Sequence, residues 1–109
     1  MMRLVLAGSA LAALLLGADP AEKPDPRDFG PGSIDVSRYP ADQKKNYEMY
    51  SVKCQKCHPL ARSVNARFTA QEWKKYMKRM IRRPNSGINE EQAASIYEFL
   101  KYYSGQLGL

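Results

Sequence analysis

The sequence predicts an all-α fold of three to four short helices, and two observations support this prediction. The first is a pair of helix-start signals, Thr69 with Glu72 and Asn89 with Gln92, which have the spacing of a capping box. The second is that apolar residues recur three and four positions apart after both signals, which is helical spacing. The chain has 109 residues, so we expect one domain.

Residues 1–18 have the composition of a secretory signal peptide. Arg3 provides the charged start, residues 4–16 form an apolar run, and small residues follow at positions 17 and 18. The apolar run is too short for a comfortable membrane span. We therefore predict cleavage after residue 18 and a mature domain that is periplasmic or otherwise exported. An uncleaved N-terminal anchor is the alternative.

Residues 19–40 are predicted to form a proline-rich arm or linker ahead of the main domain, residues 41–109. Five of the seven prolines lie in this arm, together with two glycines. A disordered tether is one interpretation of this composition. The other is that apolar side chains fasten the end of the arm to the domain; these are Phe29, Ile34, Val36 and Tyr39.

The first helix is predicted to begin near Pro40 and to run to Cys54. Proline suits the first position of a helix, and an acidic residue at position 42 suits its first turn. Tyr47, Tyr50 and Cys54 fall on one helical face. Because Pro59 blocks a simple continuation, residues 59–67 are expected to be a short basic and polar connection.

Two further helices follow this connection. One is predicted to start at Thr69 and to end before Pro84; its apolar stripe consists of Trp73, Tyr76, Met77, Met80 and Ile81. Phe68 and Trp73 are placed to form a hydrophobic staple at its start. The last helix is predicted to start at Asn89 and to stop near Gly105, with a buried face made of Ile96, Phe99, Leu100 and Tyr103.

The segment Cys54-Gln55-Lys56-Cys57-His58 is a C-x-x-C-H motif, the attachment signature of a c-type haem. Two thiols three positions apart can each add to one porphyrin vinyl group, and His58 is then placed to bind the iron as proximal ligand. Zinc would need four ligands. A disulfide-exchange site would want alternating strands and helices, and a structural disulfide would leave the histidine unexplained. We therefore expect one haem c, attached covalently through Cys54 and Cys57.

The second axial ligand of the iron cannot be another histidine, because His58 is the only one in the chain. Methionine, lysine, water or an open position remain. Met80 is our first candidate and Met77 the second, since both lie on the stripe of a separate helix. Core packing is the ordinary role of such a methionine. Met49, five residues before Cys54, is too close to the proximal side.

Charge is distributed unevenly along the chain, which has a formal net charge of +6. Residues 19–43 contain six acids and three bases, whereas residues 44–109 contain thirteen bases and five acids. The basic part is either a solvated surface or a docking surface for an acidic redox partner; the candidates are Lys53, Lys56, Lys74, Lys75, Lys78 and Arg79. Nucleic acid is not an expected partner. Arg62 and Arg67 are either solvated or placed to reach haem propionates.

Residues 41–104 resemble the class I cytochrome c family, more closely its small monohaem bacterial members. The resemblance is carried by a helix that enters C-x-x-C-H, by the sequence pattern from Trp73 to Met80, and by Ile96-Tyr97-Glu98-Phe99-Leu100-Lys101 in the last helix. It implies an all-α domain packed around one covalently bound haem, with the methionine of the Arg79-Met80 pair as axial ligand. The family's proline that orients the imidazole has no counterpart, so the group that orients His58 is left open.

The resemblance and the motif together imply a single-electron carrier. No pair of catalytic carboxylates, no nucleophile with a base and no phosphate loop indicates an enzyme. The alternatives are a haem-based sensor or small-molecule binder with an open sixth site, and an electron-transfer subunit of a larger dehydrogenase. The sequence does not indicate the redox partners, the reduction potential or the oligomeric state.

Overall fold

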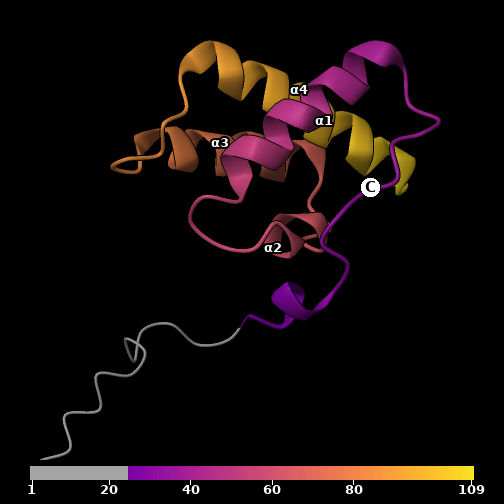
Figure 1. Ribbon diagram of the computed structural model, residues 1–109, viewed down its shortest axis with the longest axis horizontal. Coiled ribbons are helices and arrows are strands. Elements are labelled where there is room, and N and C mark those ends of the chain that lie inside the picture. Colours follow the sequence, from indigo (N-terminus) through magenta and orange to yellow (C-terminus); the bar gives the residue numbers. More distant parts are fainter. Residues whose placement is uncertain (1–24) are drawn as a thin grey trace, which may run out of the picture.

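The computed structural model describes residues 25–109, and within them the all-α prediction is confirmed. The helices are α1 (Ala41–Cys54), α2 (Ala61–Val64), α3 (Ala70–Arg82) and α4 (Glu90–Gln106), preceded by a short 3-10 turn, η1 (Pro26–Phe29) (Figure 1). No strand occurs among these residues. The predicted signal peptide, residues 1–18, lies outside the described part of the chain. None of the described helices combines the length and apolar character that a bilayer crossing requires.

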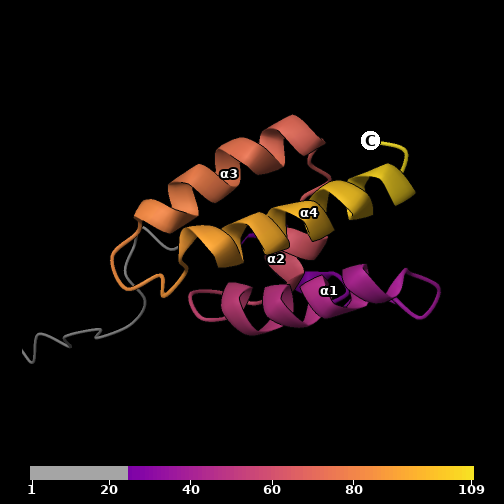
Figure 2. The same cartoon turned by 90° about the horizontal axis from the view of Figure 1, so that it is seen from above.

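Helix α4 is the centre of the fold, with α1 on one side and α3 on the other (Figure 2). Its predicted buried face is observed, because Ile96, Phe99 and Leu100 are completely buried. The helix continues through Gly105 and ends at Gln106, slightly beyond the predicted stop. The apolar area removed from water along this face is the main source of stability for the three-helix arrangement.

Helix α1 packs its predicted face against α4 through aromatic rings. The rings of Tyr47 and Tyr50 each lie 5.2 Å from that of Phe99, measured between centroids. Such offset and tilted ring pairs add to the stability gained from burial alone. The far end of the same face is Cys54, at the last position of α1. The aromatic contacts therefore fix the direction in which the C-x-x-C-H segment leaves the helix.

Both predicted capping boxes are present. Thr69 Oγ1 accepts a hydrogen bond from the Glu72 amide, and Asn89 Oδ1 accepts one from the Gln92 amide. The predicted staple is also formed, with the Phe68 and Trp73 rings 4.8 Å apart. The caps satisfy backbone N–H groups that the first turn of each helix leaves without partners.

A buried relay joins the start of α3 to the end of α4. Trp73 Nε1 donates a hydrogen bond to Ser104 Oγ at 2.9 Å, and Ser104 Oγ donates to the Phe68 carbonyl oxygen at 2.6 Å. Trp73 and Ser104 are each only 1% exposed. Each polar atom of the relay thus has a partner, which is the condition for burying polar groups without a large cost.

Helix α2 was not predicted, since residues 59–67 were expected to be an irregular connection. It is a single turn with a polar sequence and no amphipathic period, so nothing local indicates it. Its order comes from tertiary contacts: the Tyr50 hydroxyl and Ser63 Oγ are 2.6 Å apart, and Ser63 Oγ also bonds the Leu60 carbonyl. Val64 is buried in the core.

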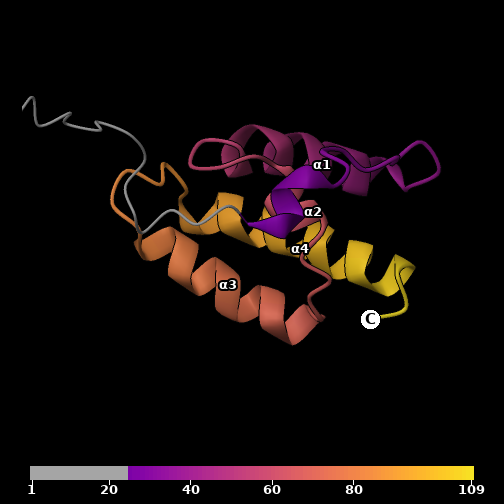
Figure 3. The same cartoon turned by 90° about the horizontal axis from the view of Figure 1, so that it is seen from below.

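The described part of the arm, residues 25–40, is packed against the helices (Figure 3). Ile34, Val36 and Tyr39 contact the core as expected, whereas Phe29 is 81% exposed and fastens nothing. Turn η1 lies on α2, and a Cβ added at Gly30 would come within 2.5 Å of the Asn65 side-chain nitrogen. The arm therefore forms one wall of a cavity that lies between the segment after α1 and helix α3.

Candidate functional site

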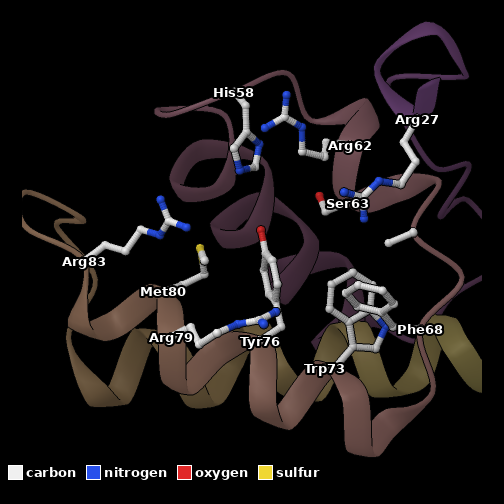
Figure 4. Close-up of a pocket in the computed structure, with 11 residues that line it drawn as sticks. Arg27, His58, Arg62, Ser63, Phe68, Trp73, Tyr76, Arg79, Met80 and Arg83 are labelled. Atoms are coloured by element: carbon white, nitrogen blue, oxygen red, sulfur yellow. The ribbon is translucent and has the colours of Figure 1, made fainter. Parts of the chain in front are cut away.

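A cavity of about 300 Å³ opens between the segment that follows α1 and one face of α3 (Figure 4). This volume is at the lower end of the range typical for small-molecule and cofactor sites. His58 forms its upper wall in the view of Figure 4, and Met80 and Tyr76 rise from α3 on the opposite side. The predicted ligands His58 and Met80 thus line the same space from separate elements.

A smaller recess of about 30 Å³ adjoins this cavity and shares His58, Tyr76 and Met80 with it. Both predicted thiols, Cys54 and Cys57, line the recess. They are free, with Cys54 half-buried and Cys57 exposed. Burial raises the pKa of the Cys54 thiol to about 12, so this thiol is protonated at neutral pH.

His58 has an unsatisfied polar atom. Its Nδ1 is buried and has no hydrogen-bond partner, the only such side-chain atom among residues 25–109. Burial, followed by the nearby charge of Arg62, holds the pKa of the imidazole below its usual value, which favours the neutral ring. A neutral imidazole is the form that binds metals. A buried polar atom without a partner usually marks a group that is missing or a functional role.

The three candidate methionines have different surroundings. Met77 is 4% exposed and belongs to the hydrophobic core, and Met49 also packs against that core. Met80 is half-buried, and Figure 4 shows its sulfur pointing into the cavity toward His58. The face of α3 that carries Met80 is therefore the cavity face, and the face that carries Met77 is the core face.

The floor of the cavity is aromatic. The rings of Phe68, Trp73 and Tyr76 contact one another, with Trp73 and Tyr76 at 5.4 Å and almost perpendicular. Burial raises the pKa of the Tyr76 hydroxyl, which points into the cavity between His58 and Met80 (Figure 4). An aromatic floor of this kind suits a flat, largely apolar ligand.

Four arginines complete the lining of the cavity: Arg27, Arg62, Arg79 and Arg83. Arg62 was one of the two arginines predicted to reach acidic groups of a ligand. Its guanidinium is, however, already bound to Asp28, with Nε to Oδ1 at 3.0 Å and Nη2 to Oδ2 at 2.8 Å. The other predicted residue, Arg67, does not line the cavity and has a positive φ of 53°.

The residues of this site fit a haem c. Two thiols adjoin a cavity that presents a neutral imidazole and a thioether, which are common axial ligands of haem iron. The aromatic floor suits the macrocycle, and the arginines suit its carboxylates. A metal ion held by the protein alone is a poorer fit, because no cluster of three or more His, Cys, Asp or Glu side chains occurs within residues 25–109.

Sequence reasoning missed several lining residues. Arg27 and Ser63 come from segments without a local signal, since one lies in the arm and the other in α2. Arg83 did have a signal: it lies three residues after Met80 and seven after Tyr76, the spacing of one helical face. Arg79 was assigned to a docking surface, although it also lines the cavity.

No protein-family model, curated protein or solved structure matches this chain. Its function is therefore inferred from the site itself. Four features bear on function: the two neighbouring free thiols, the buried imidazole nitrogen that has no partner, the thioether that points into the cavity and the wall lined by arginines.

Proposed function

We propose that this chain is an exported, monohaem c-type cytochrome of the class I type that carries single electrons between redox partners. The observation that carries the proposal is the cavity in which His58 and Met80 face each other beside both thiols of the C-x-x-C-H motif. Export rests on the sequence of residues 1–18.

Cys54 and Cys57 would hold the cofactor covalently. Addition of each S–H across a vinyl group would form a C–S bond and place the thiol hydrogen on the neighbouring carbon, with no oxidant needed. Because the Cys54 thiol is protonated at neutral pH, this addition is expected to require the maturation machinery of an exporting cell rather than spontaneous thiolate attack.

His58 and Met80 would hold the iron from opposite sides. When bound, the haem supplies a reversible one-electron iron couple, and His/Met ligation raises its potential. The chain contributes a neutral imidazole, a soft thioether and an aromatic floor. With both axial positions held by the protein, no position is left for a substrate, which favours electron transfer over catalysis.

The basic surface supports an acidic redox partner. Helix α3 carries exposed Lys74, Lys75 and Lys78, and none of them forms an ion pair within residues 25–109. Unpaired surface charge of one sign attracts partners of the opposite sign and accelerates their association. We expect the rate of reaction with an acidic partner to fall as ionic strength rises.

The proposal is tested by producing the full chain in cells competent for cytochrome c maturation. We expect the denatured protein to carry the mass of one haem, and the native ferric protein to show the weak far-red band of methionine-ligated iron. Met80→Ala should abolish this band, and Met77→Ala, a matched change on the same helix, should retain it. A colourless product with both thiols still alkylatable would refute the proposal.

Other outcomes separate the alternatives. A wild-type protein that carries haem but is high-spin and binds carbon monoxide readily would indicate a sensor or small-molecule binder. Stable co-purification with a larger oxidoreductase would indicate a dehydrogenase subunit. Retention of the far-red band in Met80→Ala would exclude Met80 as the ligand.

A further inference from the structure

The four arginines of the cavity differ in their partners. Arg27 and Arg62 form ion pairs with carboxylates of the arm, the first with Asp25 and the second chiefly with Asp28. Asp25 is also 3.7 Å from Arg62. The charges of these two guanidiniums are therefore already neutralised, and their N–H groups donate hydrogen bonds to carboxylates of the arm.

Arg79 and Arg83 have no such partner. Neither forms an ion pair with a carboxylate of residues 25–109, and no carboxylate lines the cavity. Arg79 lies over an aromatic face, with its guanidinium carbon 5.8 Å from the centre of the Tyr76 ring. The cavity wall thus carries two guanidinium charges that nothing within the described residues balances.

Arg79 lies in α3, which also carries Met80, and Arg83 is the C-cap residue of that helix, where its backbone N–H donates to the Met80 carbonyl oxygen. Arg79 precedes Met80 by one residue and Arg83 follows it by three, and Figure 4 shows the two guanidiniums on either side of the Met80 side chain. Because α3 is rigidly capped and packed through Trp73, the positions of these side chains are coupled to that of the thioether. A ligand held at Met80 is therefore within the field of both charges.

We propose that Arg79 and Arg83 bind the two carboxylates of the tetrapyrrole, whereas Arg27, paired with Asp25 inside the arm, and Arg62, which joins the arm to α2, do not bind the ligand. This inference rests on the proposed function. Two unbalanced guanidiniums match two carboxylates in charge, and guanidinium–carboxylate pairs are frequently bidentate. The sequence had offered this role for Arg62 and Arg67 only as an alternative to solvated side chains.

The experiment uses the full-length holoprotein and measures its reduction potential. The test protein is the Arg79→Gln/Arg83→Gln double variant. The control is Arg82→Gln, which removes one positive charge at a residue that is exposed like Arg79 and Arg83 but does not line the cavity. The far-red band of each variant is recorded first, so that a potential is compared only where methionine ligation is intact.

Removing the arginines should leave the carboxylates unneutralised near the iron, and their charge then favours the ferric state. We expect the ferrous-to-ferric ratio at fixed ambient potential to fall about tenfold in the double variant. For a one-electron couple this corresponds to a reduction potential that is lower by about 59 mV. The control should change the ratio by about twofold or less, because Arg82 does not line the cavity and salt screens its charge. Equal shifts in the two proteins would overturn the inference.

A second double variant allows the inference to be tested even if the double glutamine protein is obtained in poor yield. Arg79→Lys/Arg83→Lys keeps both charges but loses the planar forks, so its potential should lie below that of wild type and above that of the glutamine protein. A potential identical to that of wild type would overturn the guanidinium assignment. Absence of covalent haem from the wild-type chain is a different result, because it would refute the proposed function itself.

Discussion

The two faces of α3 differ in how completely their polar groups are satisfied. On the core face, Trp73 donates to Ser104, which donates to the Phe68 carbonyl, and Met77 packs in the hydrophobic core. On the cavity face, an imidazole nitrogen is buried without a partner, and two guanidiniums lack carboxylates within the described residues. The polar groups of the first face are satisfied by the protein, whereas the second face leaves polar groups without a protein partner among residues 25–109.

This difference separates the source of the fold from the source of the function. The fold rests on the interfaces of α4 with α1 and α3, whose largest side chains are fully buried. The site rests on segments of weaker local character, namely the residues after α1, the single turn α2 and the arm. Substitutions on the core face should therefore change stability strongly, and substitutions on the cavity face should change ligand binding while leaving stability almost unaltered.

The largest effect is expected at Phe99, which is completely buried and contacts rings of both α1 and the arm. Phe99→Ala should lower the free energy of unfolding by about 3–5 kcal/mol, because it removes buried apolar area and leaves a void. Phe99→Leu, which keeps most of the volume, should cost about 1.5 kcal/mol or less. Guanidinium denaturation of the purified proteins measures both. Equal losses would show that ring volume at this position does not matter.

The next effect concerns the buried relay. Ser104→Ala leaves Trp73 Nε1 without its acceptor in a region that water does not reach. We expect a loss of about 1–3 kcal/mol in unfolding free energy, the usual cost of an unsatisfied buried donor. Ser95→Ala, on the same helix but half-buried, should stay within about 0.5 kcal/mol of wild type. A loss at Ser104 no larger than at Ser95 would contradict the role of the relay.

The core was more predictable from the sequence than the site, for a physical reason. The aromatic face of α1, the capped stripe of α3 and the buried face of α4 are periodic, and their signals lie within one helix. Two residues of the cavity, His58 and Met80, were indicated by a motif and by ligand chemistry. Two others, Arg27 and Ser63, are brought there only by tertiary contacts. Arg62 was predicted to be either solvated or in contact with a ligand, and its ion pair was missed because nothing local reveals that Asp28 binds it from 34 residues away.

Two tyrosine hydroxyls, one in the core on α1 and one at the cavity on α3, allow the core and the cavity to be compared by the same chemical change. Tyr50→Phe removes a buried hydroxyl that lies 2.6 Å from Ser63 Oγ, and it should cost about 0.5–1.5 kcal/mol of unfolding free energy. Tyr76→Phe removes the hydroxyl that faces the cavity, and it should change stability by about 0.5 kcal/mol or less. Thermal or chemical denaturation measures both. The reverse order would show that the cavity face also contributes to the fold.

The smallest effect is expected at the two ion pairs of the arm, of which only Asp28–Arg62 joins the arm to α2. Hydrogen bonds from Arg27 hold the pKa of Asp25 below its usual range, and those from Arg62 do the same for Asp28. Carboxylates whose pKa is lower in the folded state stabilise it at pH values above their unfolded pKa, about 3.9. This contribution is fully present at neutral pH and is lost as the pH falls below that value toward the folded pKa.

Asp28→Asn should therefore loosen the arm already at neutral pH, while the core stays folded. Amide hydrogen exchange across residues 25–36 is the measurement, because it reports local opening without global unfolding. Asp35→Asn is the matched control: this carboxylate also lies in the arm, but its recorded hydrogen bond is to Ser37 within the same turn, not to α2. Faster exchange should appear in Asp28→Asn alone. The same protection in both variants would show that the apolar contacts of Ile34, Val36 and Tyr39 hold the arm without the ion pair.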